Sequence, residues 1–108
     1  MVQSVDSLCM KVELSISGRK LRDLDSFSKS DPQCMVYEKV NNQWVMIGKT
    51  EQIMNNLNPD FKTCICMNYY FEKAQELKFM MIDGDGVGDF DVIGEIYTTM
   101  GAIMGAKA

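Results

Sequence analysis

The chain has 108 residues, which is the length of one domain with a modest hydrophobic core. Hydrophobic residues make up 46% of it and charged residues 24%, as in an ordinary soluble globular domain. The formal net charge of −4 argues against a general nucleic-acid binder, whose surface would be basic, and against constitutive attraction to an anionic membrane.

No stretch of the sequence approaches the roughly 20 apolar residues of a membrane span, and the first residues lack the pattern of a signal peptide. We therefore expect a cytoplasmic protein. The four cysteines form no CxxC pair and the chain contains no histidine. We expect reduced, mostly buried thiols, with a structural zinc site or a disulfide framework as the alternative.

Hydrophobic alternation begins at residue 10 and predicts a half-buried strand over residues 10–17. Residues 18–32 are polar and rich in Ser and Asp, which predicts a long loop that ends at Pro32. Two more strands, over residues 34–40 and 44–50, are joined by a turn at Asn41 and Asn42.

The second half of the chain is also predicted to consist mainly of strands. Strands are predicted over residues 63–70, 77–82 and 92–99. Residues 77–82 are apolar except for Lys78 and read as a strand buried on both faces. Residues 71–76 could form one helical turn, and residues 100–108 form a small-residue tail without an assigned structure. Six short strands and little helix are typical of an antiparallel sandwich.

Acidic residues recur at one interval in two distant loops. Asp25 and Asp31 lie in the first long loop, and Asp83, Asp85 and Asp91 follow the strand over residues 77–82. Calcium takes about six to eight oxygen ligands, several of them anionic. Carboxylates held a few ångströms apart repel one another, so a fold that gathers them usually does so around a cation. The spacing predicts a shared cation site.

Several short motifs occur in a fixed order. They are LDSFSKSDP at 24–32, KT at 49–50, LNPDF at 57–61, DGD at 83–85 and DVIGE at 91–95. In this order they resemble the C2 domain over about residues 9–104. The stretches 25–32 and 69–77 are most similar to the first C2 domain of copines.

This resemblance implies an all-β fold, an antiparallel Greek-key β-sandwich that has eight strands in the family. The loops at one end of such sandwiches bind calcium and then phospholipid. The family's five calcium-binding aspartates correspond to Asp25, Asp31, Asp83, Asp85 and Asp91. We expect one domain over residues 1–108, with a tail at 1–8 and a body at 9–104, that ends before the family's C-terminal strand is complete.

The predicted function is therefore calcium-dependent binding of anionic phospholipid membranes. Phe27 and Val87 are predicted to enter the acyl boundary, where burial of such a side chain contributes about 1.5 to 3 kcal/mol. Lys29 is predicted to contact a headgroup phosphate. The protein would move from the cytoplasm to the plasma membrane or another membrane when calcium rises.

The same residues allow other interpretations, the simplest being that the aspartates only solvate loops and cap turns. An EF-hand would use Asp83, Asp85, Gly88 and Asp91, but its position 12 would be Gly94 and its flanks read as strands. Catalysis is not expected, because the chain lacks histidine and the GxSxG motif. A calcium-independent module that binds a protein through an exposed strand edge or groove stays open.

Overall fold

The computed structural model describes residues 9–23, 30–84 and 88–106. Within these residues the chain forms six strands and one short helix, which are, in chain order, β1 (Cys9–Leu14), β2 (Pro32–Val40), β3 (Gln43–Lys49), β4 (Ile65–Tyr70), β5 (Glu76–Asp83), β6 (Asp91–Thr99) and α1 (Met100–Gly105). Each of the six predicted strands is present.

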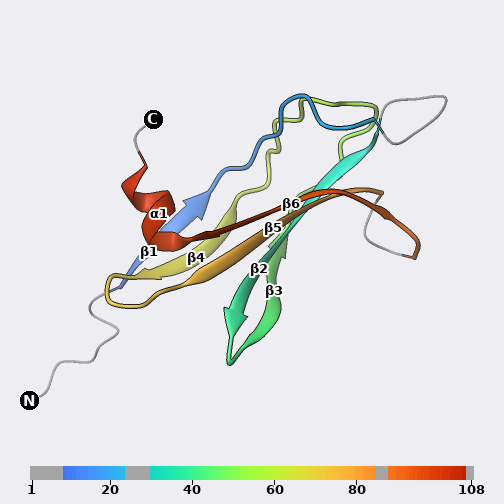
Figure 1. Ribbon diagram of the computed structural model, residues 1–108. Helices are drawn as coiled ribbons and strands as arrows, with labels where there is room; N and C mark the ends of the chain where they lie inside the picture. The colour runs from blue at the N-terminus through green and yellow to red at the C-terminus, as the bar shows by residue number, and fades with distance from the viewer. Residues whose placement is uncertain (1–8, 24–29, 85–87, 107–108) are drawn as a thin grey trace, which may run out of the picture.

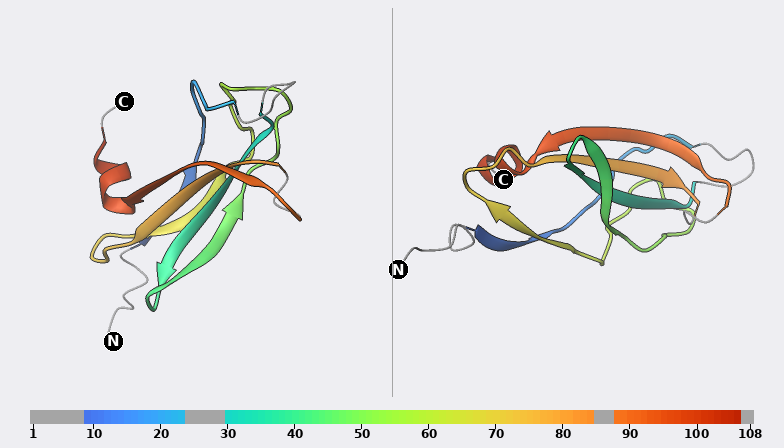
Figure 2. Two further views of the ribbon diagram at one scale, coloured as in Figure 1. Left: turned by 45° about the vertical axis from the view of Figure 1, so that its right-hand side comes forward. Right: turned by 90° about the horizontal axis from the view of Figure 1, so that it is seen from below.

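The strands form two antiparallel layers. One sheet has the order β3-β2-β5-β6, and the other pairs β1 with β4 (Figure 1). Figure 2 shows the two-stranded sheet lying over one face of the four-stranded sheet, so that only part of that face is covered. The predicted all-β antiparallel sandwich is confirmed.

The core lies between the two layers, and strand alternation explains which residues fill it. Leu14 of β1 and Ile65 of β4 are cross-strand partners, and both are buried. Lys11 and Glu13 of β1 face outward and are exposed. The buried cluster as a whole contains Leu14, Cys34, Val36, Phe61, Ile65, Leu77 and Met100. Burial of each large apolar side chain contributes about 1.5 to 3 kcal/mol.

The turn between β2 and β3 follows from its two asparagines. Asn41 and Asn42 both have positive φ, at 51° and 63°. A two-residue hairpin whose turn matches the twist of its strands needs φ > 0 at both positions, and asparagine tolerates it better than most residues. The predicted turn is confirmed.

One local prediction, the helical turn over residues 71–76, was wrong. Residues 71–75 form a non-helical turn in which Lys73 N–H donates to Tyr70 O (3.1 Å). The buried side chain of Gln75 holds this turn, because it accepts from Tyr70 N–H and donates to Asn68 O, both at 2.9 Å. The C-terminal tail, for which no structure was predicted, forms α1, and the side chain of Thr99 caps this helix by accepting from Ala102 N–H.

Strand β5 has fully buried residues on both faces. Alternation places Leu77 on the inner face, with the core, and Ile82 on the outer face, and both are fully buried. Lys78 and Met80, also on the outer face, are partly exposed. On this outer face the Lys78 ammonium lies over the rings of Tyr37 and Trp44, 4.6 and 5.3 Å from their centroids. Cation–π contacts of this kind stabilise the lysine ammonium at the surface of the sheet.

Candidate functional site

Three predicted cation ligands lie at neighbouring strand ends. Asp83 is the last residue of β5 and Asp91 the first residue of β6, and the two are cross-strand partners. Pro32, the first residue of β2, is paired with Asp83 from the other side, so that Asp31 lies next to it along the chain. These strand ends lie at the opposite end of the four-stranded sheet from α1 (Figure 1).

Hydrogen bonds fix two of these carboxylates. Asp83 Oδ1 accepts from Asp31 N–H (2.9 Å), and Asp31 Oδ1 accepts from Asn55 N–H (2.7 Å). Gly84 N–H donates to Asp31 O at 3.1 Å, and Gly84 has a φ of 130°, which a side chain would strain. Within the described residues, these bonds use one oxygen of each carboxylate. In the described part of the chain, the second oxygen of Asp31 and of Asp83 accepts no hydrogen bond, so each could coordinate a cation.

The charges at these strand ends are uncompensated within the described residues. Two ion pairs occur among the described residues, Arg19–Asp60 and Lys39–Glu76, and neither involves any of the three aspartates. Like charges directly opposite each other in a sheet are destabilising. A hard divalent cation would remove this repulsion, and carboxylate oxygens are the ligands that it prefers. The donors present therefore fit calcium.

Five predicted site residues cannot be placed. Asp25, Phe27, Lys29, Asp85 and Val87 lie outside the described residues. Among the described residues, no three histidine, cysteine, aspartate or glutamate side chains form a group that could hold a metal ion. The complete set of five ligands stays a prediction.

Strand β6 contains a bulge beside the site. Met81 is paired with Gly94 and Ile82 with Val92, which leaves Ile93 as an extra residue. Arg22, from the segment that leads into the first loop, donates from Nε to Ile93 O (3.0 Å) and from Nη2 to Val92 O (3.2 Å). No sequence pattern indicated this role, because Arg22 is one cation in a polar loop.

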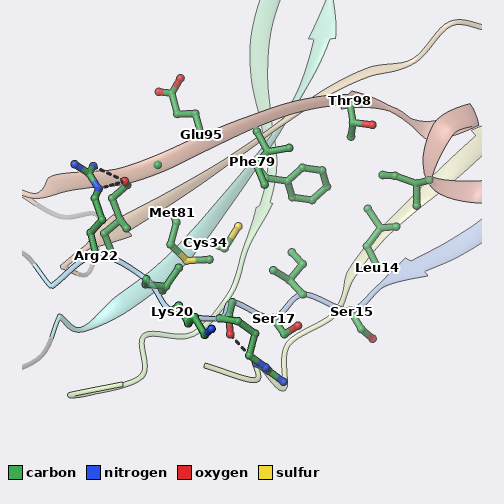
Figure 3. Close-up of a pocket in the computed structure, with 18 residues that line it drawn as sticks. Leu14, Ser15, Ser17, Lys20, Arg22, Cys34, Phe79, Met81, Glu95 and Thr98 are labelled. Carbon is green, nitrogen blue, oxygen red and sulfur yellow. Dashed lines mark hydrogen bonds between the residues drawn. The ribbon is translucent and has the colours of Figure 1, made fainter. Parts of the chain in front are cut away.

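A cleft of about 770 Å³ opens between residues 14–22 and the inner face of β5 and β6 (Figure 3). Ile96, the cross-strand partner of Phe79, lines it and is 66% exposed. A Cβ added at Gly94 would meet nothing within 4 Å. In the described residues, β1 has a strand neighbour on one side only. An apolar face and a strand edge are thus accessible together.

The cysteines differ from the prediction. All four are free thiols, as expected, but Cys64 and Cys66 are exposed and Cys9 is partly exposed. Cys34 is buried in the core, and this burial raises its pKa from the usual 9.0 to about 11. Cys64 and Cys66 alternate with Ile65 and Met67, which face the core, so their exposure follows from strand period.

A family model described as the C2 domain matches residues 10–107. The chain belongs to the C2 domain family. The predicted resemblance to copines is also confirmed. Copine-E of Dictyostelium discoideum is 48% identical over 105 residues, and Copine-A of the same organism is 50% identical over 95. These matches cover 91% and 87% of this chain, but only 18% and 16% of the length of the two copines.

Solved structures support the same fold. A structure described as BON1-C2B has a TM-score of 0.75 and 24% identity, and the match covers 93% of this chain and 70% of that one. Human GIVD cytosolic phospholipase A2 has a TM-score of 0.67 and 17% identity, over 87% of this chain and 13% of the enzyme. In the part of the chain that the structure describes, no helix is long and apolar enough to cross a membrane.

Proposed function

We propose that this C2 domain binds anionic phospholipid membranes in a calcium-dependent way, with Asp25, Asp31, Asp83, Asp85 and Asp91 as the calcium ligands. The observation that carries the proposal is the placement of Asp83 opposite Asp91, with Asp31 hydrogen-bonded beside them and no basic partner for the three among the described residues. Bound calcium would supply positive charge and open coordination positions for headgroup oxygens.

The protein's own residues would gate this binding through their charge. Without a cation, the carboxylates at the ends of β2, β5 and β6 repel an anionic surface, over a distance that physiological salt limits to about 8 Å. With the carboxylates neutralised, Phe27 and Val87 would enter the acyl boundary and Lys29 would contact a headgroup phosphate. The protein would accordingly leave the cytoplasm for a membrane when calcium rises. The domain itself is proposed to have no catalytic role.

Sedimentation with vesicles tests the proposal. The protein is mixed with phosphatidylserine vesicles in calcium or in a chelator, and with phosphatidylcholine vesicles in calcium. We expect co-sedimentation with phosphatidylserine in calcium, and its loss in Asp83→Asn. Asparagine keeps an oxygen that can accept the Asp31 N–H, so this variant removes charge with little change in shape. Equal sedimentation in chelator would refute the proposal.

A matched control keeps the overall charge change the same. Asp60 is exposed and pairs with Arg19 away from the strand ends. Asp60→Asn removes one negative charge, as Asp83→Asn does, but leaves Asp31, Asp83 and Asp91 unchanged. It should sediment like the unmodified domain. A loss in Asp60→Asn as large as in Asp83→Asn would point to net charge instead of a cation site.

A second candidate function is calcium-independent binding of an extended polypeptide strand. The exposed inner face at Ile96 favours it, together with the edge of β1 that has no strand neighbour among the described residues. Added strands obtain affinity from backbone hydrogen bonds and specificity from alternate side chains. Calorimetric titration separates the two functions. Absence of heat at millimolar calcium would favour the second candidate over the first.

A further inference from the structure

Arg22 connects strand β6 to the residue that precedes Asp31. Its backbone oxygen accepts from Ser30 Oγ (3.1 Å), and its guanidinium donates to the carbonyls of Val92 and Ile93 in β6. Figure 3 shows the side chain extended from its own segment to the edge of β6. One residue thus contacts the start of β6 and the residue that precedes Asp31.

The bulge explains why β6 needs this partner. A bulge leaves its extra residue outside the regular ladder, and a backbone carbonyl without a partner is costly when it is shielded from water. The side chain of Ile93 is buried at 5% exposure, so the bulged residue is fixed on the core side. The Arg22 guanidinium, which lines the same cleft as Ile93, donates to the Ile93 carbonyl. The bulged residue is therefore held by the packing of its side chain and by a hydrogen bond to its backbone.

The contacts lie close to two candidate ligands. Val92 and Ile93 directly follow Asp91, and Ser30 directly precedes Asp31. Ser30 is fully buried, so it cannot shift without disturbing its neighbours. A change in the length or the angle of the Arg22 contacts would move Asp91 relative to Asp31. Side chains that orient metal ligands from outside the coordination shell typically change metal affinity by about 10- to 100-fold when they are replaced.

We infer that Arg22 is a positioning residue that holds Asp91 at a fixed place relative to Asp31, so that both can bind one divalent cation. The part that concerns the cation rests on the proposed function. Arginine suits this role because its planar, multi-donor guanidinium can bind two adjacent carbonyls at once, whereas a lysine ammonium has no such fixed fork. The positioning role therefore requires the fork geometry of the guanidinium as well as its positive charge.

Two variants and one control test the inference. Arg22→Gln removes the charge and most of the donors, and Arg22→Lys keeps the charge but loses the fork. Arg19→Gln changes a nearby arginine whose ion pair and hydrogen bonds, within the described residues, go to Asp60, Gly18, Asn58 and Pro59 and not to β6. Calcium affinity is measured by calorimetry, and hydrogen exchange of the amides at residues 91–94 is measured without calcium. Amides at residues 34–37 of β2 report on the stability of the whole sheet.

We expect both Arg22 variants to bind calcium about tenfold more weakly than the unmodified domain, and Arg19→Gln to bind as it does. Exchange at residues 91–94 should become faster in both Arg22 variants, while exchange at residues 34–37 stays the same. Full calcium affinity in Arg22→Lys would show that charge alone matters and would overturn the inference. Faster exchange at both sets of amides would show general destabilisation and would also overturn it.

The exchange measurement separates this inference from the proposed function. If the unmodified domain bound no calcium, the proposed function would fail, yet exchange at residues 91–94 would still show whether Arg22 fixes the start of β6. If the domain binds calcium and the Arg22 variants bind it equally well, the proposed function stands and the positioning role is refuted.

Discussion

The backbone N–H of Asp31 donates to Oδ1 of Asp83 at 2.9 Å, between residues that are 52 positions apart in the sequence. This bond joins the start of β2 to the end of β5 through a side chain that is also a candidate cation ligand. A substitution at Asp83 can therefore remove the hydrogen-bond acceptor, the negative charge, or both. Asparagine keeps the acceptor and removes the charge, whereas alanine removes both, so only the first isolates the electrostatic contribution.

Replacement of Asp91 by asparagine is expected to change thermal stability in opposite directions with and without calcium. Asp83 and Asp91 are cross-strand partners of like charge, so Asp91→Asn should raise the melting temperature of the calcium-free domain slightly. In the unmodified domain, calcium at one hundred times its Kd should add about 2.7 kcal/mol of stability per site. Asp91→Asn should lose most of this gain. A calcium-induced shift of equal size in both proteins would contradict the prediction.

Two alanine substitutions should separate the covered part of the core from the cleft. Leu77 is fully buried, and Leu77→Ala should lower the free energy of unfolding by about 2 to 5 kcal/mol. Ile96 faces the same side of the sheet but is 66% exposed, so Ile96→Ala should cost no more than about 0.5 kcal/mol. Urea denaturation measures both values. A large loss in Ile96→Ala would mean that the inner face of β6 is covered in solution.

Thiol alkylation should follow exposure and thiolate content. Cys64 and Cys66 are exposed and should react with iodoacetamide within minutes at pH 8. Cys34 is buried and its pKa is raised to about 11, so it should react only when the domain unfolds. Mass spectrometry of peptides after timed labelling gives the rate at each cysteine. Labelling of Cys34 as fast as Cys64 would contradict the buried placement.

Acid should weaken one tertiary contact between residues 51 and 62–63. The Glu51 carboxylate accepts from the backbone N–H groups of Lys62 (2.7 Å) and Thr63 (3.1 Å). The bond from Lys62 is the main cause that lowers the Glu51 pKa from its usual 4.5 to about 2. Because the folded pKa lies below the unfolded one, the stabilisation is complete above pH 4.5 and is lost as the pH falls toward 2.

Glu51→Gln provides the comparison for this pH dependence. The difference in unfolding free energy between the two proteins should be constant near neutral pH and should change only between about pH 5 and 2. Contact of the carboxylate with solvent limits the size of the effect. Urea denaturation at pH 7, 5 and 3 measures it. A difference that is the same at all three values would show that the charge of Glu51 does not contribute.

Local sequence patterns were enough to place the strands. Period-two alternation located β1, and Asn41 and Asn42 indicated the turn between β2 and β3, because both signals depend on nearby residues only. The turn at residues 71–75 was missed because it depends on the buried side chain of Gln75, which bonds to Asn68 and Tyr70. Helix α1 was missed because its weak propensity is compensated by the Thr99 cap and the burial of Met100.

The candidate site was predicted less completely than the fold. Motif order identified the loops, and the structure places Asp31, Asp83 and Asp91 at adjoining strand ends. The bulge at Ile93 is a property of the register between two strands, so no single segment reveals it. The contact of Arg22 with Ile93 O spans 71 positions and depends on that register. Asp25 and Asp85, outside the described residues, stay predictions.

Because of the bulge in β6, the number of residues from 91 to 94 determines which face of the sheet Asp91 and the rest of β6 occupy. Side chains in a strand alternate between faces, so deletion of one residue there would turn either Asp91 or the rest of β6 to the opposite face. Insertion of one residue would have the same effect. Point substitutions at Val92 would leave the alternation intact. Related domains that keep the proposed cation ligands should therefore vary in composition between Asp91 and Gly94 but not in length.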